Sequence, residues 1–392
     1  MQTNVRSCIF ITMSILFLMN FIYAILYFAG SFPNGYVWGE LFIKYTDGLV
    51  RRGLIGSILF FFADFFNICL LWTVFITIVY CVFFIKVYYL FRTTVTYFFT
   101  IVLFFSPALI AFFVKDQNLY GRKDIIVISL LFISMSVCAK ILMEMKSTKM
   151  RWVTVALCYI TAFLVHEITL FFSLLPAILV IAAAGCRKYL AASLIIAVFC
   201  LSALFAVHFQ GTDAMRDLMF QDWKSVLENF TTQGGMRFIG KQVGKHEAVP
   251  LVWLQNHSLL VSYIEAWLLA LLPVALLMYV YRFHMVCTSV IGRLLTWVSY
   301  LCALFPVVAL TAMINDFGRI ISYSILFFLF FMLFIMNAYR EKYGSLPVRS
   351  CIEKLDFSYL PVLVASLYYL LCWKLYHYVP LHMDPKIISI SV

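Results

Sequence analysis

Four short polar segments of this chain each combine an acid with a base, and each lies beside a long apolar run. In the first, 45-YTDGLVRRGLIG-56, Asp47 precedes Arg51 and Arg52. An Asp at i and an Arg at i+4 can pair on one helix face, which presents an ionised carboxylate held by a guanidinium. Such a carboxylate is a candidate general base. The alternative is an interfacial anchor, because arginine side chains extend toward lipid headgroups.

The second segment, 115-KDQNLYGRKD-124, crowds three cations and two carboxylates into a short loop. This charge density favours binding of a pyrophosphate, since Arg holds phosphate oxygens through a planar fork of donors. A solvated turn is the alternative interpretation. The candidate binding residues of this loop are Lys115, Asp116, Arg122, Lys123 and Asp124.

Two further pairs lie next to apolar runs. His166 and Glu167 stand between two apolar stretches, and ionisable residues in that setting generally face a bundle interior or a water-filled cavity. An interhelical hydrogen bond is the simpler alternative. Asp316 and Arg319, spaced i, i+3 at the start of a run, could instead satisfy each other at a helix start. We expect all four segments to contribute to one site, because four coincidences on one face are less probable than one shared function.

The elements that must position these residues are membrane helices. A hydrophobic fraction of 64%, a charged fraction of 12% and a mean hydropathy of +0.98 exclude a soluble domain. Crossing the hydrocarbon core takes about 20 apolar residues, and backbone polar groups inside it must be satisfied within each segment. The chain is therefore expected to be one all-α, polytopic integral membrane domain over 1–392, with about 11 (10–12) transmembrane helices. The expected spans are 8–29, 66–90, 94–114, 125–143, 152–165, 168–185, 189–208, 259–281, 294–313, 320–339 and 358–377.

The basic residues indicate the orientation. One set of loops carries Lys and Arg with few acids, whereas the opposite loops hold most of the Asp, Glu and His residues. By the positive-inside rule the basic loops are cytoplasmic, so the four polar segments are expected on the outer face. That face also holds the first loop, 30–65, in which the run 54–65 is too short to cross and is expected to be interfacial or re-entrant. The largest outer segment is 209–258, where apolar residues at helical spacing in 215–230 predict an amphipathic helix.

Outside the cytoplasmic membrane there is no nucleotide supply, so activated donors there are usually lipid-linked phosphates or pyrophosphates. Arg and Lys could hold that group while an Asp or Glu deprotonates an acceptor hydroxyl during glycosyl transfer. The sequence contains no Gly-rich phosphate loop and no Cys or His zinc spacing, and we expect no cofactor and no nucleic-acid partner. A divalent ion held by the carboxylates is left open.

The segments 45-YTDGLVRRGLIG-56, 121-GRKD-124, 315-NDFGR-319 and the His166–Glu167 pair, set in many spans, resemble the GT-C class of lipid-donor glycosyltransferases. They also resemble the Wzy-type O-antigen and capsule repeat-unit polymerases. The resemblance implies a bacterial inner-membrane enzyme acting on an undecaprenyl-pyrophosphate-linked oligosaccharide in the lipid bilayer, with a chain-length regulator as a candidate partner. Such polymerases commonly have two large Arg-rich periplasmic loops, and this chain has one, so polymerase and single-addition transferase both stay open.

Under this interpretation each candidate has a role. Asp47 is the base or the carboxylate that positions the acceptor. His166 and Glu167, or Asp316, orient sugar hydroxyls. Arg51, Arg52, Arg122, Lys123 and Arg319 hold the donor pyrophosphate. The segment 209–258 covers the site and contacts the glycan through Trp223, Arg237 and Trp253, because aromatic and Arg side chains give large contact areas. Two rival classes are a lipid-linked glycan transporter or flippase and a membrane O-acyltransferase. The scarcity of ionisable residues within the spans counts against the first, and the position of DGLVRRG after the first span counts against the second.

Overall fold

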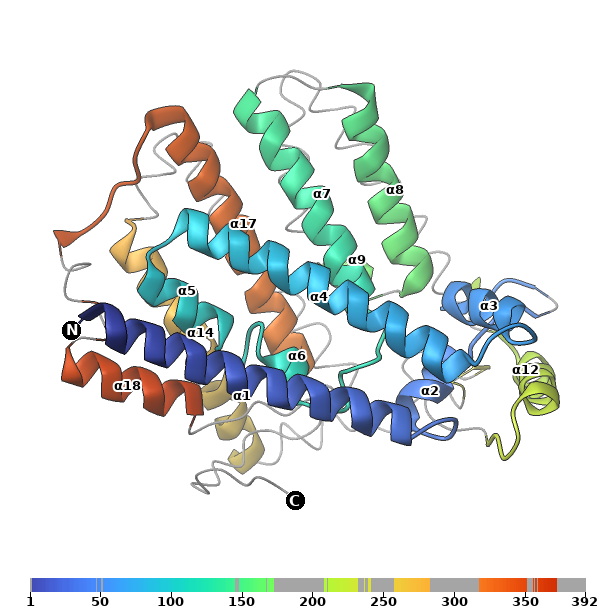
Figure 1. The fold of residues 1–392 in the computed structure, drawn as a ribbon. Coiled ribbons are helices and arrows are strands. Elements are labelled where there is room, and N and C mark those ends of the chain that lie inside the picture. The colour runs from blue at the N-terminus through green and yellow to red at the C-terminus, as the bar shows by residue number, and fades with distance from the viewer. Residues whose placement is uncertain are drawn as a thin grey trace. The chain divides into compact units, whose positions relative to one another are not determined.

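The computed structural model describes residues 2–46, 48–50, 52–144, 148–166, 168–172, 208–209, 211–231, 236, 239–240, 257–282, 317–350, 355, 357 and 359–371. Within these ranges the regular structure is helical, with no strand (Figure 1). The chain divides into two compact units, each assembled from separate stretches. Unit 1 comprises Met1–Tyr23, Phe84–Asp116 and Val249–Val392, and unit 2 comprises Ala24–Phe83 and Gln117–Ala248. We describe each unit by itself.

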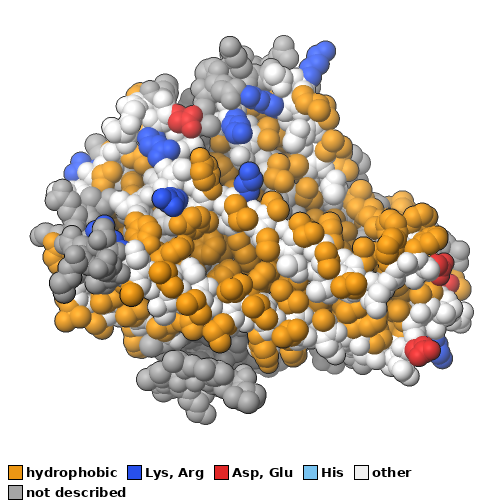
Figure 2. Space-filling model, in the orientation of Figure 1, with side chains coloured by type: hydrophobic (Ala, Val, Ile, Leu, Met, Phe, Trp, Pro, Cys, Tyr) orange, Lys and Arg blue, Asp and Glu red, His pale blue; other side chains and the backbone are white. Residues whose placement is uncertain are grey.

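Four of the described helices are long and apolar enough to span a membrane, which supports a helical membrane protein. Their candidate spans are Arg6–Gly30, Ile68–Thr94, Asp124–Ile141 and Gly318–Glu341. They belong to α1 (Gln2–Gly30), α4 (Ile68–Thr94), α7 (Asp124–Glu144) and α17 (Phe317–Tyr343). Large apolar side chains are exposed along α1 and α4, and Figure 2 shows hydrophobic side chains gathered on the face that α1 crosses. An apolar exterior of this kind suits lipid as the surrounding solvent.

Other expected spans take a different form. Residues 94–114 are not one helix: α5 (Tyr97–Phe104) ends before Pro107, and α6 (Phe112–Lys115) follows a series of turns. Proline disfavours the helical conformation in the residue that precedes it, which accounts for the break at Ser106. The side chains of 98–114 are nevertheless buried, so this run is apolar because it lies inside unit 1. The expected spans 189–208 and 294–313, and 173–185 of another, lie essentially outside the described residues.

Unit 1 also contains α14 (His257–Val280) and α18 (Leu360–Leu371). Its interior is aromatic, with the rings of Phe113 and Tyr323 stacked at 5.7 Å. The hydroxyl of Tyr369 lies 2.8 Å from that of Ser106, which joins α18 to the turn after α5. In the same unit the Nζ of Lys115 donates to the carbonyl of Leu370 at 2.8 Å.

Unit 2 contains five described helices that are shorter than the four candidate spans. They are α2 (Tyr36–Leu41), α3 (Gly53–Phe62), α8 (Lys149–Val165), α9 (Thr169–Phe172) and α12 (Asp213–Val226). At about 1.5 Å per residue, α3 is too short to cross a bilayer, as the sequence predicts. The predicted break at 166 is present, because α8 ends at Val165 with His166 in an extended conformation. The predicted amphipathic helix is also present as α12, capped by the Thr212 hydroxyl, which accepts from the N–H of Met215.

Candidate functional site

The centre of the candidate site is Glu40 on α2, an acid that lies in the apolar stretch GYVWGELF. α2 is held against the end of α1 by Trp38, whose ring stacks on Phe28 at 4.3 Å and whose indole N–H donates to the Phe28 carbonyl at 3.1 Å. Trp38 and the remainder of α2 after Tyr36 are buried. The aromatic packing therefore places a carboxylate in the interior of unit 2.

Three side chains from different segments converge on this carboxylate. Arg52 Nη1 lies 3.0 Å from Glu40 Oε1, and Arg122 Nη2 lies 3.3 Å from Oε2. The imidazole Nε2 of His166 is 3.1 Å from Oε1. The side chains of Glu40, Arg122 and His166 are each 3% exposed, whereas that of Arg52 is 23% exposed. The cluster is thus desolvated at its centre and reaches solvent through Arg52.

Asp124 adds a second carboxylate at the first residue of α7. Its Oδ2 lies 3.7 Å from Arg122 Nε, and its Oδ1 lies 3.9 Å from His166 Nε2. An acid in the first turn of a helix is favoured by the helix dipole. Arg122 therefore pairs with two carboxylates.

Electrostatics keep Glu40 ionised despite its burial. Burial alone raises the pKa of a carboxyl group, because it disfavours the charged form. The guanidinium of Arg122 and the hydrogen bond from His166 oppose this effect, and Arg52 adds to them. The pKa of Glu40 consequently lies well below its usual range. A carboxylate held in this way is a weak base, since a general base works best with a pKa near the operating pH.

The backbone sets the tautomer of His166. The N–H of Ile168 donates to His166 Nδ1 at 3.1 Å, so Nδ1 is the acceptor nitrogen and the ring proton is on Nε2. That proton is directed to Glu40 Oε1. The hydroxyl of Thr169 bonds to the carbonyls of His166 and Ala162, which fixes the break between α8 and α9. His166 is therefore a neutral hydrogen-bond donor to Glu40.

Arg52 is held through its backbone as well as its side chain. It is the N-cap of α3 and has a left-handed conformation, with φ of 66°. Such conformations are uncommon for residues other than glycine, and they persist where the surrounding structure holds them. Here the Nζ of the fully buried Lys123 donates to the Arg52 carbonyl at 2.9 Å. The loops at 52 and at 122–124 are therefore joined directly by this hydrogen bond and indirectly through Glu40.

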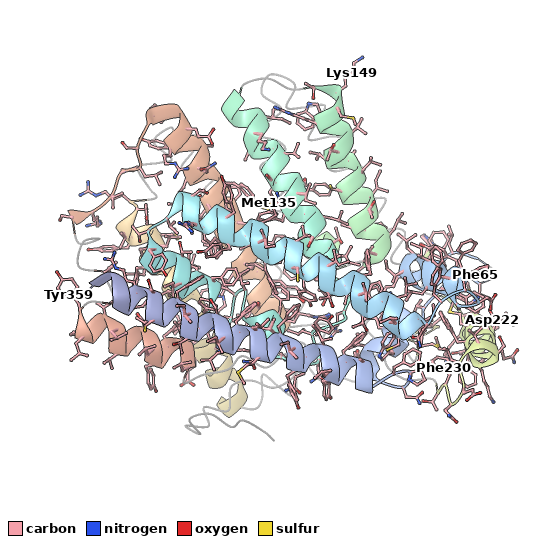
Figure 3. The ribbon with its side chains drawn as sticks, in the orientation of Figure 1. Phe65, Met135, Lys149, Asp222, Phe230 and Tyr359 are labelled. Atoms are coloured by element: carbon pink, nitrogen blue, oxygen red, sulfur yellow. The ribbon has the colours of Figure 1, made fainter. Side chains whose placement is uncertain are left out.

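α12 is anchored to the segment that follows α2. Lys44 pairs with Asp222 at 2.6 Å and lies over the ring of Phe60 at 3.8 Å (Figure 3 labels Asp222). The indole N–H of Trp223 donates to the Phe42 carbonyl at 2.7 Å, and Trp223 is fully buried. Trp223 therefore packs α12 against the segment that follows α2, and its buried ring has no exposed face for a glycan.

Apart from Trp223, the sequence-based candidates fall into three groups. Five come together in unit 2: Arg52, Arg122, Lys123, Asp124 and His166. Three others belong to unit 1: Asp116 and Arg319, which are buried, and Lys115, which is half-buried. Asp47, Arg51, Glu167, Arg237, Trp253 and Asp316 lie outside the described residues.

Glu40 is the residue that the sequence analysis missed. Its signal was present: an acid with apolar neighbours on both sides, the same feature that singled out His166. The nearest base in the sequence, Lys44, pairs with Asp222 and not with Glu40. Its partners are 12, 82 and 126 residues away along the chain.

The cluster suits an anion better than a metal ion. Arg52 and Arg122 pair with Glu40, Arg122 also pairs with Asp124, and Lys123 bonds to the Arg52 carbonyl. Among the described residues of this cluster, cationic side chains therefore outnumber carboxylates. Among the residues that the structure describes, no group of three or more His, Cys, Asp or Glu side chains could hold a metal ion. Comparison of the chain with protein-family models, with curated proteins and with solved structures finds no match.

Proposed function

We propose that this protein is a periplasmic-face glycosyltransferase of the bacterial cytoplasmic membrane. In this proposal it joins undecaprenyl-pyrophosphate-linked oligosaccharides, as an O-antigen or capsular polysaccharide polymerase. The observation that carries the proposal is the pairing of Arg52 and Arg122 with one buried carboxylate, Glu40, in a chain with helices long and apolar enough to span a membrane. The ammonium of Lys123 adjoins this pair through its hydrogen bond to the Arg52 carbonyl. Burying several charges is costly and requires compensating partners. A phosphate ligand gives such an arrangement a function.

The chemistry follows from the charges. An acceptor hydroxyl attacks the anomeric carbon of the donor sugar, and the bond between that carbon and the pyrophosphate oxygen breaks. The lipid pyrophosphate leaves with the electron pair, and fixed cations stabilise the charge that develops on it. Arg52, the most exposed member of the cluster, is placed to meet that group first. Its planar guanidinium matches phosphate oxygens in a way that a lysine ammonium cannot.

The acceptor proton requires a separate base. Glu40 is unsuited, because its pKa lies well below its usual range and both of its oxygens contact cations or His166. We therefore retain Asp47 as the proposed base, since it precedes Arg52 by five positions in the outer segment.

The test is the length distribution of surface polysaccharide in a strain that lacks this protein. A polymerase predicts loss of long chains with retention of single repeat units. Loss of one sugar from every repeat unit would indicate a single-addition transferase instead, and an unchanged polysaccharide would reject both.

The deletion strain also tests whether Asp47 is the general base. Restoring the wild-type gene should recover the polymer, whereas Asp47→Asn should reduce the rate by about 10²–10⁴-fold at normal protein abundance, the usual contribution of a general base. Full polymer from the Asn variant would remove Asp47 from the mechanism.

A further inference from the structure

Glu40 lies at the centre of the cluster in unit 2, because its two carboxylate oxygens contact three side chains from different segments. Oε1 accepts from Arg52 and His166, and Oε2 accepts from Arg122. These residues come from the start of α3, the loop before α7 and the end of α8. A single carboxylate on α2 thus orients groups from three other segments.

The contacts indicate how Glu40 acts. As a deeply buried side chain it is remote from solvent, and its oxygens are engaged by donors. Direct attack on a substrate proton would require those donors to leave. Arg52 has the opposite character, since its side chain is 23% exposed. Any effect of Glu40 on a ligand therefore passes through Arg52.

The position of Arg52 is set from both ends. Lys123 holds its backbone carbonyl, and Glu40 holds Nη1 of its side chain. Arg122 lies behind, close to both Glu40 and Asp124. This arrangement fixes the guanidinium of Arg52, the most exposed member of the cluster, while the guanidinium of Arg122 stays buried between two carboxylates.

We propose that Glu40 is a positioning residue that holds Arg52, with Arg122 behind it, in the geometry that binds a diphosphate group. The inference rests on the proposed function for the identity of the donor, a polyprenyl diphosphate, but the binding step itself needs no glycosyl transfer. Glu40 is thereby separated from the base: it contributes to affinity for the diphosphate and takes no part in the proton transfer. His166 supports it as a neutral donor to Oε1.

The experiment measures binding of inorganic pyrophosphate to the purified, detergent-solubilised full chain by calorimetry. We expect Arg52→Lys to weaken binding about tenfold, the effect of losing a hydrogen bond to a charged group. Glu40→Gln should weaken it by a similar factor. In the double variant the loss should be little more than in either single variant, because both changes disturb the same guanidinium. Arg216→Lys, on the surface of α12, is the matched control and should bind as the wild type does.

The alternatives give different results. If Glu40 only neutralises buried charge, Glu40→Gln leaves the affinity for pyrophosphate unchanged or increases it, and this result would overturn the proposal. Losses of affinity that simply add in the double variant would overturn it too. If Glu40→Gln does not fold, Glu40→Asp keeps the charge on a shorter side chain. The Glu40→Asp variant should then bind pyrophosphate more weakly, with a melting temperature close to that of the wild type. Wild-type affinity in this variant would overturn the proposal. Absence of pyrophosphate binding to the wild type would overturn it as well.

The outcome for the proposed function is independent. Pyrophosphate binding that depends on Glu40 and Arg52, together with normal polysaccharide in the deletion strain, would reject the polymerase and keep the positioning role. Loss of polymer in the deletion strain, together with unchanged pyrophosphate binding in Glu40→Gln, would keep the polymerase and reject the positioning role.

Discussion

Among the described residues of unit 2, an arginine meets two carboxylates in a surface cluster and in a buried one, and the two clusters differ in burial and in charge environment. On the surface of α12, Arg216 lies 2.6 Å from Asp213 and 3.1 Å from Asp217. In the interior, Arg122 lies 3.3 Å from Glu40 and 3.7 Å from Asp124. The surface distances are shorter, yet the surface carboxylates are 71% and 65% exposed while the interior ones are 3% exposed. Burial, not distance, separates them.

The difference in burial indicates that the interior cluster is the one related to function. Exposed ion pairs contribute about 0–1 kcal/mol, because water and salt screen them. Buried pairs are costly to form and strongly destabilising to break, since breaking one leaves an uncompensated charge in the interior. A chain has little reason to maintain the buried cluster for stability alone. A ligand that uses the cluster would provide the reason, and four experiments test the comparison.

The largest effect is expected from Arg122→Gln. The substitution removes the cation shared by Glu40 and Asp124 and leaves two carboxylates together in a desolvated place. We expect a loss of about 3–5 kcal/mol in the free energy of unfolding, the usual cost of removing one partner of a buried pair. Thermal unfolding in detergent and protein abundance in membranes both measure it. A loss below about 1 kcal/mol would show that the cluster is as weak as the surface one.

The pH dependence of stability tests Glu40 directly. Its pKa is lowered well below its usual range in the folded protein, mainly by Arg122 working against burial. A lowered pKa gives stability that is fully present above the unfolded pKa of about 4.3 and is lost as the pH falls through the folded pKa. The difference in melting temperature between wild type and Glu40→Gln should therefore be constant from neutral pH down to about 4.3 and shrink below it. A difference that already shrinks between pH 7 and pH 5 would mean that the pKa is raised.

Gly56→Ala tests how the buried cluster is positioned. α3 starts beside Arg52 and packs so closely on the preceding segment that a Cβ at Gly56 would lie 2.0 Å from the carbonyl oxygen of Ile43. Because backbone cannot move aside as a side chain can, we expect a loss of about 1–3 kcal/mol and reduced pyrophosphate binding. Gly30→Ala is the matched control, with nothing within 4 Å of the added methyl. Equal behaviour of the two variants would show that the seating of α3 does not position Arg52.

The smallest effect is expected from Arg216→Gln. Arg216 bonds within α12 to side chains that are mostly exposed. The free energy of unfolding should change by no more than about 0.5 kcal/mol, and any change should diminish at high salt. A loss comparable to that of Arg122→Gln would abolish the distinction between the two clusters.

Much of the local structure of unit 2 could be predicted from the sequence. The spacing of apolar residues in 215–230 predicted an amphipathic helix, and α12 spans Asp213–Val226. The short run after Arg52 could not cross a bilayer, and α3 ends at Phe62. The polar residues at 166 and 167 predicted an interruption, and α8 ends at Val165. These properties depend on neighbours within a few residues, so periodicity, run length and capping suffice to determine them.

The run 94–114 shows where that approach fails. An apolar run of this length is typical of a membrane span, but α5 and α6 are separated by turns and their side chains are buried within unit 1. Lipid and protein interior are equally apolar solvents, so composition does not distinguish them. Only packing determined that this segment is interior.

The candidate site shows the same division. By itself the sequence determined that this is a helical membrane protein and that polar groups at 52, 122–124 and 166 interrupt apolar runs, because composition and local pattern are sufficient for both. The tertiary structure alone decided that Arg52, Arg122 and His166 meet at Glu40. Their separations along the chain leave no periodic signal, and a lone acid among apolar residues has the same local pattern whether it faces a partner, water or a headgroup. Its partner is chosen by desolvation and long-range packing, which act only once the chain has folded.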